Sequence, residues 1–291
     1  DALSGGITTV MTGPGSANVI SGVSLVMKTA GRSLEEMVIV PQAGLKVAFG
    51  ENPKRVYGEQ KKMPGTRMAI AALLRQALMD AEDYRAKKAK AQKDGEVIER
   101  DLGLENILLV LEHKMPLRAH AHRADDIATA LRIAEEFKVD LVIEHGTEAH
   151  KLIPELLRRK VPVVVGPTLT SRSKVELAEL NWQTASALYQ AGIPVTITTD
   201  HSVVPIQYLP LCAALAVKKG LPEEAALEAI TINAARILGL ESRIGSLEAG
   251  KDADFVVFDG YPLDWRSRVE QVYINGQEVY NCKQQGIMKR W

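Results

Sequence analysis

Runs of apolar and β-branched residues recur along the chain and predict strands that are buried on both faces. These runs lie at residues 7–10, 37–40, 44–49, 117–120, 141–145, 161–165 and 195–200. Between the later runs, apolar residues recur at helical spacing over 124–137, 151–159, 174–190 and 222–238. Strand and helix patterns that alternate in this way predict an α/β fold with a parallel sheet, and their number favours a (β/α)8 TIM-type barrel over a doubly wound sheet.

The last fifty or so positions have a different pattern. Strand-like runs lie at 255–258 and 272–280, and the second is interrupted by Asn275-Gly276, a dipeptide typical of tight hairpin turns. No further strand–helix unit follows the helical patterns. We therefore expect a barrel domain over residues 1–238 and a small β module over residues 239–291.

Charge and cysteine content exclude several classes of partner. The 36 basic and 36 acidic side chains cancel, which gives no electrostatic reason to expect nucleic acid or an anionic membrane as a partner. Cys212 and Cys282 lie too far apart in sequence to indicate a disulfide framework, and they fit a reducing compartment such as the cytoplasm. No uninterrupted apolar run is long enough to cross a bilayer. A small-molecule substrate is the expected partner, and a homo-oligomer is compatible with this composition.

The first residues resemble the end of a structural element. Asp1 to Gly6 has the pattern of a helix that runs into a glycine stop, and the chain has no initiator Met. We therefore expect an N-terminal piece to precede Asp1.

Three polar residues end predicted strands. His120 and His145 each close one run, and Asp200 closes the last. Taken singly, such a His is more often a hydrogen-bonded polar residue, and such an Asp is more often a turn residue or a helix cap. Active sites of parallel barrels are built at the carboxyl ends of the strands, and imidazole and carboxylate groups are suitable ligands for a divalent metal such as Zn²⁺. Together the three residues favour a metal site.

Five segments, in order along the chain, resemble those of a known family. Residues 5–10 resemble the second-strand segment of amidohydrolases, and residues 118–122, which contain His-Ala-His, resemble the fifth-strand segment. Residues 143–146, Glu-His-Gly preceded by Ile, resemble the sixth-strand segment, and Thr199-Asp200 resembles the eighth. Residues 244–257 resemble the return into the small β-sandwich. On these segments the chain resembles the amidohydrolase superfamily of metal-dependent hydrolases, and most closely its imidazolonepropionase-like branch.

The resemblance implies a TIM-type barrel with its first strand missing, followed by part of the β-sandwich. It also implies that His120 and His145 are metal ligands, and that Asp200 is both a ligand and the general base. The family's cofactor is one or two divalent metals, most often zinc, in each full-length chain. The His-x-His pair of the first strand does not precede Gly5, so we expect residues 1–291 alone to hold less than one metal per chain and to hydrolyse little.

The remaining site residues leave alternatives open. Relatives often use a glutamate or a carboxylated lysine from a middle strand to hold metal, and the candidates here are Glu51, which we prefer, and Lys46. An ion pair of Glu51 with a neighbouring basic residue is an equally plausible interpretation. His122 and His201 are candidates for substrate binding, or for hydrogen bonds that orient other ligands.

Two functions follow from these assignments. The first is a metal-dependent hydrolase that cleaves an amide, cyclic amide or peptide-like C–N bond by metal-activated water, with Asp200 accepting and returning the proton. The alternative is a catalytically inactive barrel fragment, or a degenerate relative that lacks the His-x-His metal ligands.

Overall fold

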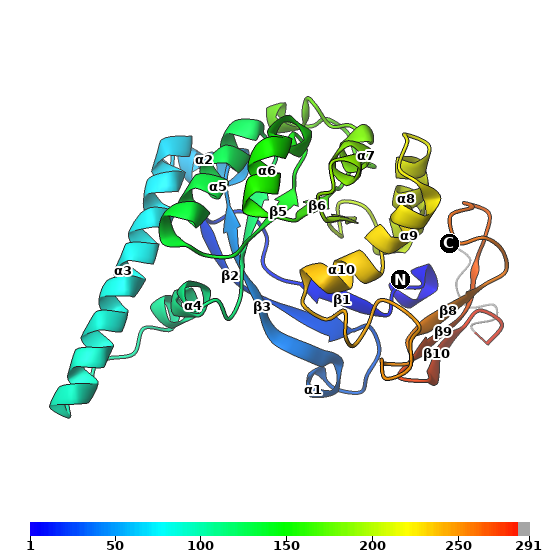
Figure 1. Cartoon of the computed structure of the whole chain (residues 1–291), viewed down its shortest axis with the longest axis horizontal. Helices are drawn as coiled ribbons and strands as arrows, with labels where there is room; N and C mark the ends of the chain where they lie inside the picture. The colour runs from blue at the N-terminus through cyan, green and yellow to red at the C-terminus, as the bar shows by residue number, and fades with distance from the viewer. Residues whose placement is uncertain (285–291) are drawn as a thin grey trace.

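The computed structural model describes residues 1–284, and its core is one seven-stranded sheet (Figure 1). The strands follow one another across the sheet in chain order. They are β1 (Thr9–Thr12), β2 (Ile20–Lys28), β3 (Val38–Ala48), β4 (Leu117–Ala121), β5 (Leu141–His145), β6 (Val163–Val165) and β7 (Val195–Ile197). The sheet is curled, and β1 and β7 form its two edges within the described residues. This architecture confirms the α/β class and fits the TIM-type fold of amidohydrolases.

Five neighbouring strands, β3 to β7, run parallel, as predicted. The first three strands depart from the prediction, because β1, β2 and β3 pair antiparallel as a meander. Strand β2 was not predicted, since its apolar residues are interrupted by Ser21, Gly22 and Ser24. The two runs expected at 37–40 and 44–49 belong to the single long strand β3, which continues through an exposed Pro41 and Gln42.

Helices join the parallel strands and cover the outer side of the sheet (Figure 1). Between β3 and β4 lie α2 (Glu51–Glu59), α3 (Arg67–Asp94) and α4 (Leu102–Leu111). The next connections are α5 (Ala124–Phe137), then η2 (Ala149–Leu152) with α6 (Ile153–Arg159), then η3 (Val175–Leu177) with α7 (Gln183–Gln190). After β7 come η4 (Ile206–Tyr208), α8 (Leu209–Val217), α9 (Glu223–Ala229) and α10 (Ile232–Ile237). The short elements η1 (Leu3–Gly5) and α1 (Leu34–Met37) lie near the start of the chain.

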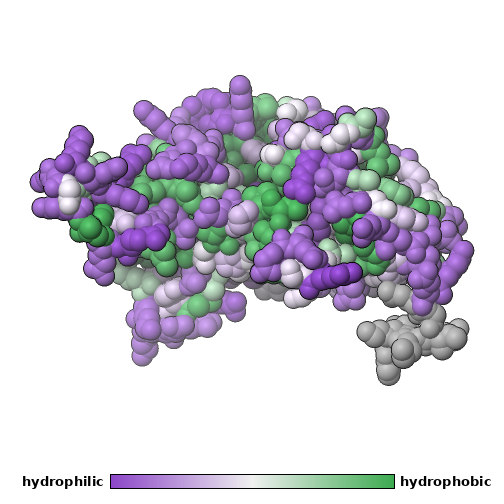
Figure 2. Space-filling model, turned by 90° about the horizontal axis from the view of Figure 1, so that it is seen from below, coloured by the Kyte–Doolittle hydropathy of each residue, from purple (hydrophilic) through white to green (hydrophobic). Residues whose placement is uncertain are grey.

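Helix α3 extends beyond the body of the molecule at one end (Figure 1). It begins at a cap in which Thr66 Oγ1 accepts a hydrogen bond from Ala69 N at 3.1 Å. Its buried side chains include Ile70, Leu74 and Leu78, which recur every four residues and face the core. Figure 2 shows that the corresponding end of the molecule is mostly hydrophilic. None of the helices within residues 1–284 combines the length and apolar character that a bilayer-spanning helix needs.

A separate three-stranded antiparallel sheet follows the helices. It contains β8 (Phe255–Phe258), β9 (Val269–Ile274) and β10 (Gln277–Asn281), with β9 in the middle. The expected hairpin is confirmed, because Asn275 (φ 53°) and Gly276 (φ 75°) form its two-residue turn with the positive φ values of a type I′ turn. The assignment of residues 239–291 to a β-sandwich stays a prediction, and residues 285–291 lie outside the described part.

A buried ion pair ties the large sheet to the segment that leads into the small one. The ammonium of Lys28, at the end of β2, is only 2% exposed. It lies 2.5 Å from Asp254 Oδ2 and 2.8 Å from Asp252 Oδ2. Burial alone would raise the pKa of Asp252, but the hydrogen bonds and charges of Lys28 and, after it, Arg243 together outweigh burial and hold that pKa below its usual value.

Replacing Lys28 with Met is therefore expected to destabilise the protein by about 3 kcal/mol, because the carboxylate of Asp254 then loses its cation while it stays largely out of water, whereas Asp252 keeps its pair with Arg243. The matched control is Lys114→Met, which breaks the exposed pair of Lys114 with Glu112 and is expected to cost less than about 1 kcal/mol. Urea denaturation followed by circular dichroism measures both. Equal losses in the two variants would contradict the structural role given to Lys28.

Candidate metal centre

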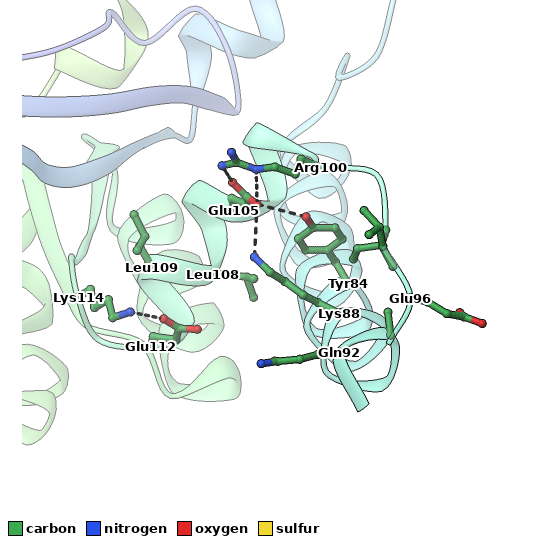
Figure 3. Close-up of a pocket in the computed structure, with 13 residues that line it drawn as sticks. Tyr84, Lys88, Gln92, Glu96, Arg100, Glu105, Leu108, Leu109, Glu112 and Lys114 are labelled. Atoms are coloured by element: carbon green, nitrogen blue, oxygen red, sulfur yellow. Dashed lines mark hydrogen bonds and ion pairs between the residues drawn. The ribbon is translucent and has the colours of Figure 1, made fainter. Parts of the chain in front are cut away.

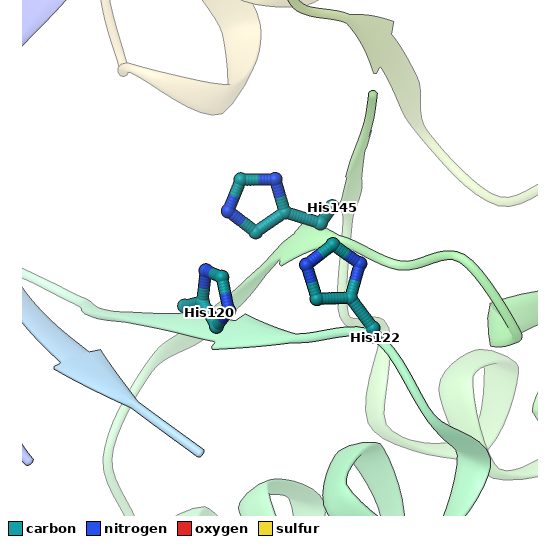
Figure 4. A group of neighbouring side chains, drawn as sticks. All are labelled: His120, His122 and His145. Carbon is teal, nitrogen blue, oxygen red and sulfur yellow. The ribbon is translucent and has the colours of Figure 1, made fainter. Parts of the chain in front are cut away.

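Three histidine side chains converge at the carboxyl ends of two neighbouring parallel strands (Figure 4). His120 lies on β4, His122 directly follows it, and His145 ends β5. Their ring centroids are 4.3 to 4.8 Å apart, and one ligand nitrogen from each lies within 4.8 Å of the other two. All three are at most 5% exposed. The parallel register brings them together, since it aligns Ala121 of β4 with His145 of β5.

Hydrogen bonds orient the three rings, and for His145 they fix a tautomer that suits metal binding. His145 Nδ1 lies 2.7 Å from the carbonyl oxygen of Gly166, which only accepts, so Nδ1 carries the proton and Nε2 keeps its lone pair. His122 Nδ1 lies 2.8 Å from the hydroxyl of Thr147. His120 Nε2 lies 3.3 Å from the amide nitrogen of Asn52, which only donates, and His120 Nδ1 is buried with no partner. Partners of this kind orient the ligand rings of metal sites.

Burial keeps all three imidazoles in the neutral form. It is the largest cause that lowers the pKa of His120, His122 and His145. The neighbouring imidazoles lower the pKa of His120 and His122 further, and the ammonium of Lys46 acts on all three rings. Neutral imidazole is the form that coordinates a metal, so the electrostatics of the site match the chemistry of its donors.

Asp200 and His201 lie on the same side of the sheet, beyond the carboxyl end of β7. Both line a pocket of about 380 Å³ together with His145, Lys46 and Arg118. The carboxylate of Asp200 acts on His145 in the direction that raises the pKa of this ring, against the larger effect of burial. His201 is exposed, and its Nδ1 accepts a hydrogen bond from a backbone amide at 3.2 Å.

A buried ion pair lies beside the histidines on the inner face of the sheet. Arg118 Nε donates to Glu144 Oε1 at 2.6 Å, and both residues are at most 5% exposed. Burial alone would raise the pKa of Glu144, but Arg118, followed by Lys46, outweighs it and holds that pKa below its usual value. The pocket therefore has both a cationic and an anionic side chain in its wall.

The two candidates for the middle-strand ligand have different positions. Lys46 lies on β3 beside Arg118 and lines the pocket with His145 and Asp200. Glu51 begins α2, where its amide donates to Glu176 Oε2 at 2.8 Å and its own carboxylate accepts from Glu176 N at 3.4 Å. The structure thus brings Lys46, rather than Glu51, to the pocket that holds Asp200.

The structure gathers most of the site residues expected from the sequence, and it adds others. His120, His122 and His145 form one cluster, with Asp200 and His201 in the adjoining pocket. His122, expected to bind substrate or to orient another ligand through a hydrogen bond, lies in the same cluster as His120 and His145. Sequence reasoning missed Asn52, Thr147 and Glu176, whose side chains lie beside the cluster, and Lys174, which contacts Glu176 and Asn52. No motif marks them, and Glu176 lay in a segment expected to be helical.

A second hollow, of about 740 Å³, lies between α3 and α4 (Figure 3). Its wall contains the network of Glu105 with Arg100, Lys88 and Tyr84. It has no histidine or cysteine in its wall. Its side chains offer no metal-ligating set, so the chemistry of the described residues concentrates at the histidine cluster.

A model of the amidohydrolase family matches residues 1–279. The chain belongs to this family. It is 32% identical over 306 residues to Amidohydrolase tasK of Hapsidospora irregularis, covering 96% of this chain and 31% of that protein. It is also 36% identical over 184 residues to an imidazolonepropionase of Solibacter usitatus, covering 57% of this chain and 44% of that protein. These matches confirm the resemblance to the imidazolonepropionase-like branch.

One solved structure is similar over nearly the whole chain. The crystal structure of an amidohydrolase from Thermotoga maritima MSB8 superposes with a TM-score of 0.95 at 51% identity, and the match covers 96% of this chain and 73% of that one. By contrast, the chain spans less than half the length of the curated relatives that it matches.

The pKa shifts predict how stability depends on pH in the metal-free protein. The three imidazoles have lowered pKa values when folded, whereas the unfolded chain takes up protons on them near pH ~6.5. Their contribution is therefore complete above about pH 6.5 and is lost as the pH falls below it, by up to about 1.4 kcal/mol per pH unit for each ring. Urea denaturation of chelator-treated protein between about pH 8 and 5 measures this slope. His122→Gln should make the slope shallower, and an unchanged slope would contradict the assignment.

Proposed function

We propose that the protein is a metal-dependent hydrolase that cleaves a C–N bond with water activated at a divalent cation. The observation that carries the proposal is the cluster of three buried, neutral imidazoles at the carboxyl ends of β4 and β5, with Asp200 in the adjoining pocket. Membership of the amidohydrolase family supports it.

The donors present fit a divalent metal. His120, His122 and His145 would hold it through nitrogen, and Glu176 Oε1, a buried atom near the cluster, has no hydrogen-bond partner among the described residues. A buried polar atom normally has a hydrogen-bond partner. An unpaired one beside a set of ligand nitrogens therefore supports the binding of a cation at this place. A set dominated by imidazole nitrogen favours zinc among the common hydrolytic metals. When bound, such a cation lowers the pKa of water and polarises a carbonyl group.

The chain's own residues supply the remaining functions. The carboxylate of Asp200 lies at the exposed rim of the pocket, where it accepts the proton of the attacking water and returns it to the leaving nitrogen. Arg118 and Glu144 line the inner part of the pocket and restrict it to a small molecule with polar groups. The names of the relatives favour an amide or cyclic amide as the bond that is cut, with a peptide-like bond as the other possibility.

We assign the role of the metal ligand from a middle strand to Lys46. Lys46 lines the pocket with His145, and its charge influences all three imidazoles, whereas Glu51 contacts Glu176. An ammonium group has no lone pair for a metal, so the role requires the carboxylated form of lysine that the family resemblance implies.

The first test measures metal content and turnover of the natural protein, with whatever segments flank residues 1–291. We expect at least one zinc per chain by plasma mass spectrometry, and hydrolysis of members of a panel of cyclic amides, N-acyl amino acids and dipeptides. Asp200→Asn should lower turnover by about 100- to 10,000-fold, because proton transfer is lost while the fold remains. A metal-free wild-type protein, or an Asp200→Asn variant with normal turnover, would contradict the mechanism.

The second test separates the two middle-strand candidates. Lys46→Ala should lower zinc affinity by about 10- to 100-fold, as loss of a group close to the ligands does. Glu51→Gln is the matched control and should change affinity by no more than a few-fold, because its amide keeps an oxygen that can accept from Glu176 N. Competition with a chromophoric chelator measures both. A larger loss of zinc affinity in Glu51→Gln than in Lys46→Ala would instead identify Glu51 as the middle-strand ligand.

A further inference from the structure

Glu176 is a buried carboxylate that belongs to none of the strands. It lies in η3, in the connection that follows β6, and is 1% exposed. Its Oε2 accepts a hydrogen bond from the amide of Glu51 at 2.8 Å, which fixes the carboxylate at the start of α2. Its Oε1 is buried without any hydrogen-bond partner among the described residues. Burying a carboxylate oxygen without a partner costs free energy, so a partner for this atom is expected in the functional protein.

The unpaired oxygen faces two rings of the histidine cluster. Glu176 Oε1 lies 3.9 Å from His120 Nε2 and 3.8 Å from His122 Nε2. These separations are too long for hydrogen bonds. Ligand atoms that share one zinc ion at about 2.0–2.2 Å stand roughly 3–4 Å from one another. The space between the oxygen and the two nitrogens therefore has the dimensions of a coordinated cation.

The charges around the cluster favour the same interpretation. Three neutral imidazoles bring no negative charge, and the ammonium group of Lys174 acts on both His120 and His122. A divalent cation in surroundings of this kind is stabilised by a buried carboxylate close to its nitrogen ligands. Glu176 is the one acidic residue recorded within 4 Å of an imidazole of the cluster in residues 1–284.

The backbone next to the site leaves room for this carboxylate. Gly50, between β3 and α2, has a φ of +82°. A Cβ at this position would lie 2.7 Å from Glu176 Oε2 and 2.9 Å from Asp126 Oδ2. Both the conformation and the space thus require glycine at position 50. The close approach of α2 to Glu176 is therefore built into the fold.

Lys174 provides a counter-charge for the same oxygen. Its Nζ lies 3.6 Å from Glu176 Oε1 and 2.5 Å from Asn52 Oδ1. The side chain is 29% exposed, whereas that of Glu176 is fully buried, so the ammonium can withdraw toward solvent while the carboxylate stays. A cation that entered between Glu176 and the imidazoles would compete with this ammonium.

We propose that Glu176 is a further metal ligand, which places Oε1 on the same cation as His120 and His122. In the absence of the cation, Lys174 compensates the charge of that oxygen. The inference rests on the proposed metal-dependent function and extends it, because it assigns a carboxylate ligand to the connection after β6. The competing interpretation is structural: Glu176 would only cap α2 and pair with Lys174.

The test measures zinc affinity by chelator competition, and the visible spectrum of the Co²⁺-substituted natural protein. Glu176→Gln keeps an amide oxygen for the Glu51 amide but loses the charge, and we expect zinc affinity to fall about 10-fold or more, with an altered Co²⁺ spectrum. The matched control is Asp126→Asn, another buried carboxylate beside Gly50, whose partner is Arg67 and not an imidazole. It should keep wild-type affinity and spectrum. Lys174→Met should tighten zinc binding, because it removes the competing ammonium.

Wild-type affinity and spectrum in Glu176→Gln, with strong zinc binding by the unmodified protein, would overturn the inference and leave the proposed function intact. A wild-type protein that binds neither zinc nor Co²⁺ would overturn both. If Glu176→Gln does not fold, the result for Lys174→Met decides. Tighter binding supports a ligand role, and unchanged or weaker binding shows that the carboxylate is structural.

Discussion

Burial of three imidazoles at the carboxyl ends of two central strands is the constraint on which the site depends. An imidazole that is removed from water is disfavoured in its charged form, so it must stay neutral and satisfy its N–H group within the protein. The carbonyl of Gly166 and the hydroxyl of Thr147 provide this for His145 and His122. Neutral rings keep one nitrogen lone pair each, and here one ligand nitrogen from each ring lies within 4.8 Å of the other two, which suits the binding of a cation.

Fixed charges around the cluster nearly balance, and this balance explains why so many ionisable groups can be buried close together. Arg118 is neutralised by Glu144 at 2.6 Å. Lys174 lies near Glu176, and its exposed fraction of 29% lets water share its charge. Replacing Arg118, Glu144 or Lys174 leaves a buried partner unpaired, which costs more than the pair itself contributes. The charged side chains of the pocket therefore depend on one another, and a single substitution among them is expected to affect both the stability of the protein and its binding of ligands.

The sequence predicted the parts of the site that local pattern determines. His120 and His145 lie at the ends of strands whose apolar runs are clear, Asp200 follows another such strand, and parallel strands bring their carboxyl ends to the same side of the sheet. Strand β2 was missed because serine and glycine interrupt its pattern, and with it the antiparallel start of the sheet. Glu176 was missed for another reason. Its place is set by a hydrogen bond to Glu51, 125 positions away in sequence, and no local pattern encodes such a contact.

The backbone at the ends of two strands explains how adjacent residues both reach the site. In a regular strand, Glu144 and His145 would point to opposite faces of the sheet. Both are buried on the inner side instead, Glu144 against Arg118 and His145 against His120. His145 has a φ of 74° and Asp200 a φ of 50°, a left-handed conformation that is uncommon for residues other than glycine. Such a conformation costs about 1–3 kcal/mol and persists only where surrounding contacts enforce it. The hydrogen bond from His145 to Gly166 is one such contact, so the same interaction that fixes the tautomer also turns the ring toward the cluster.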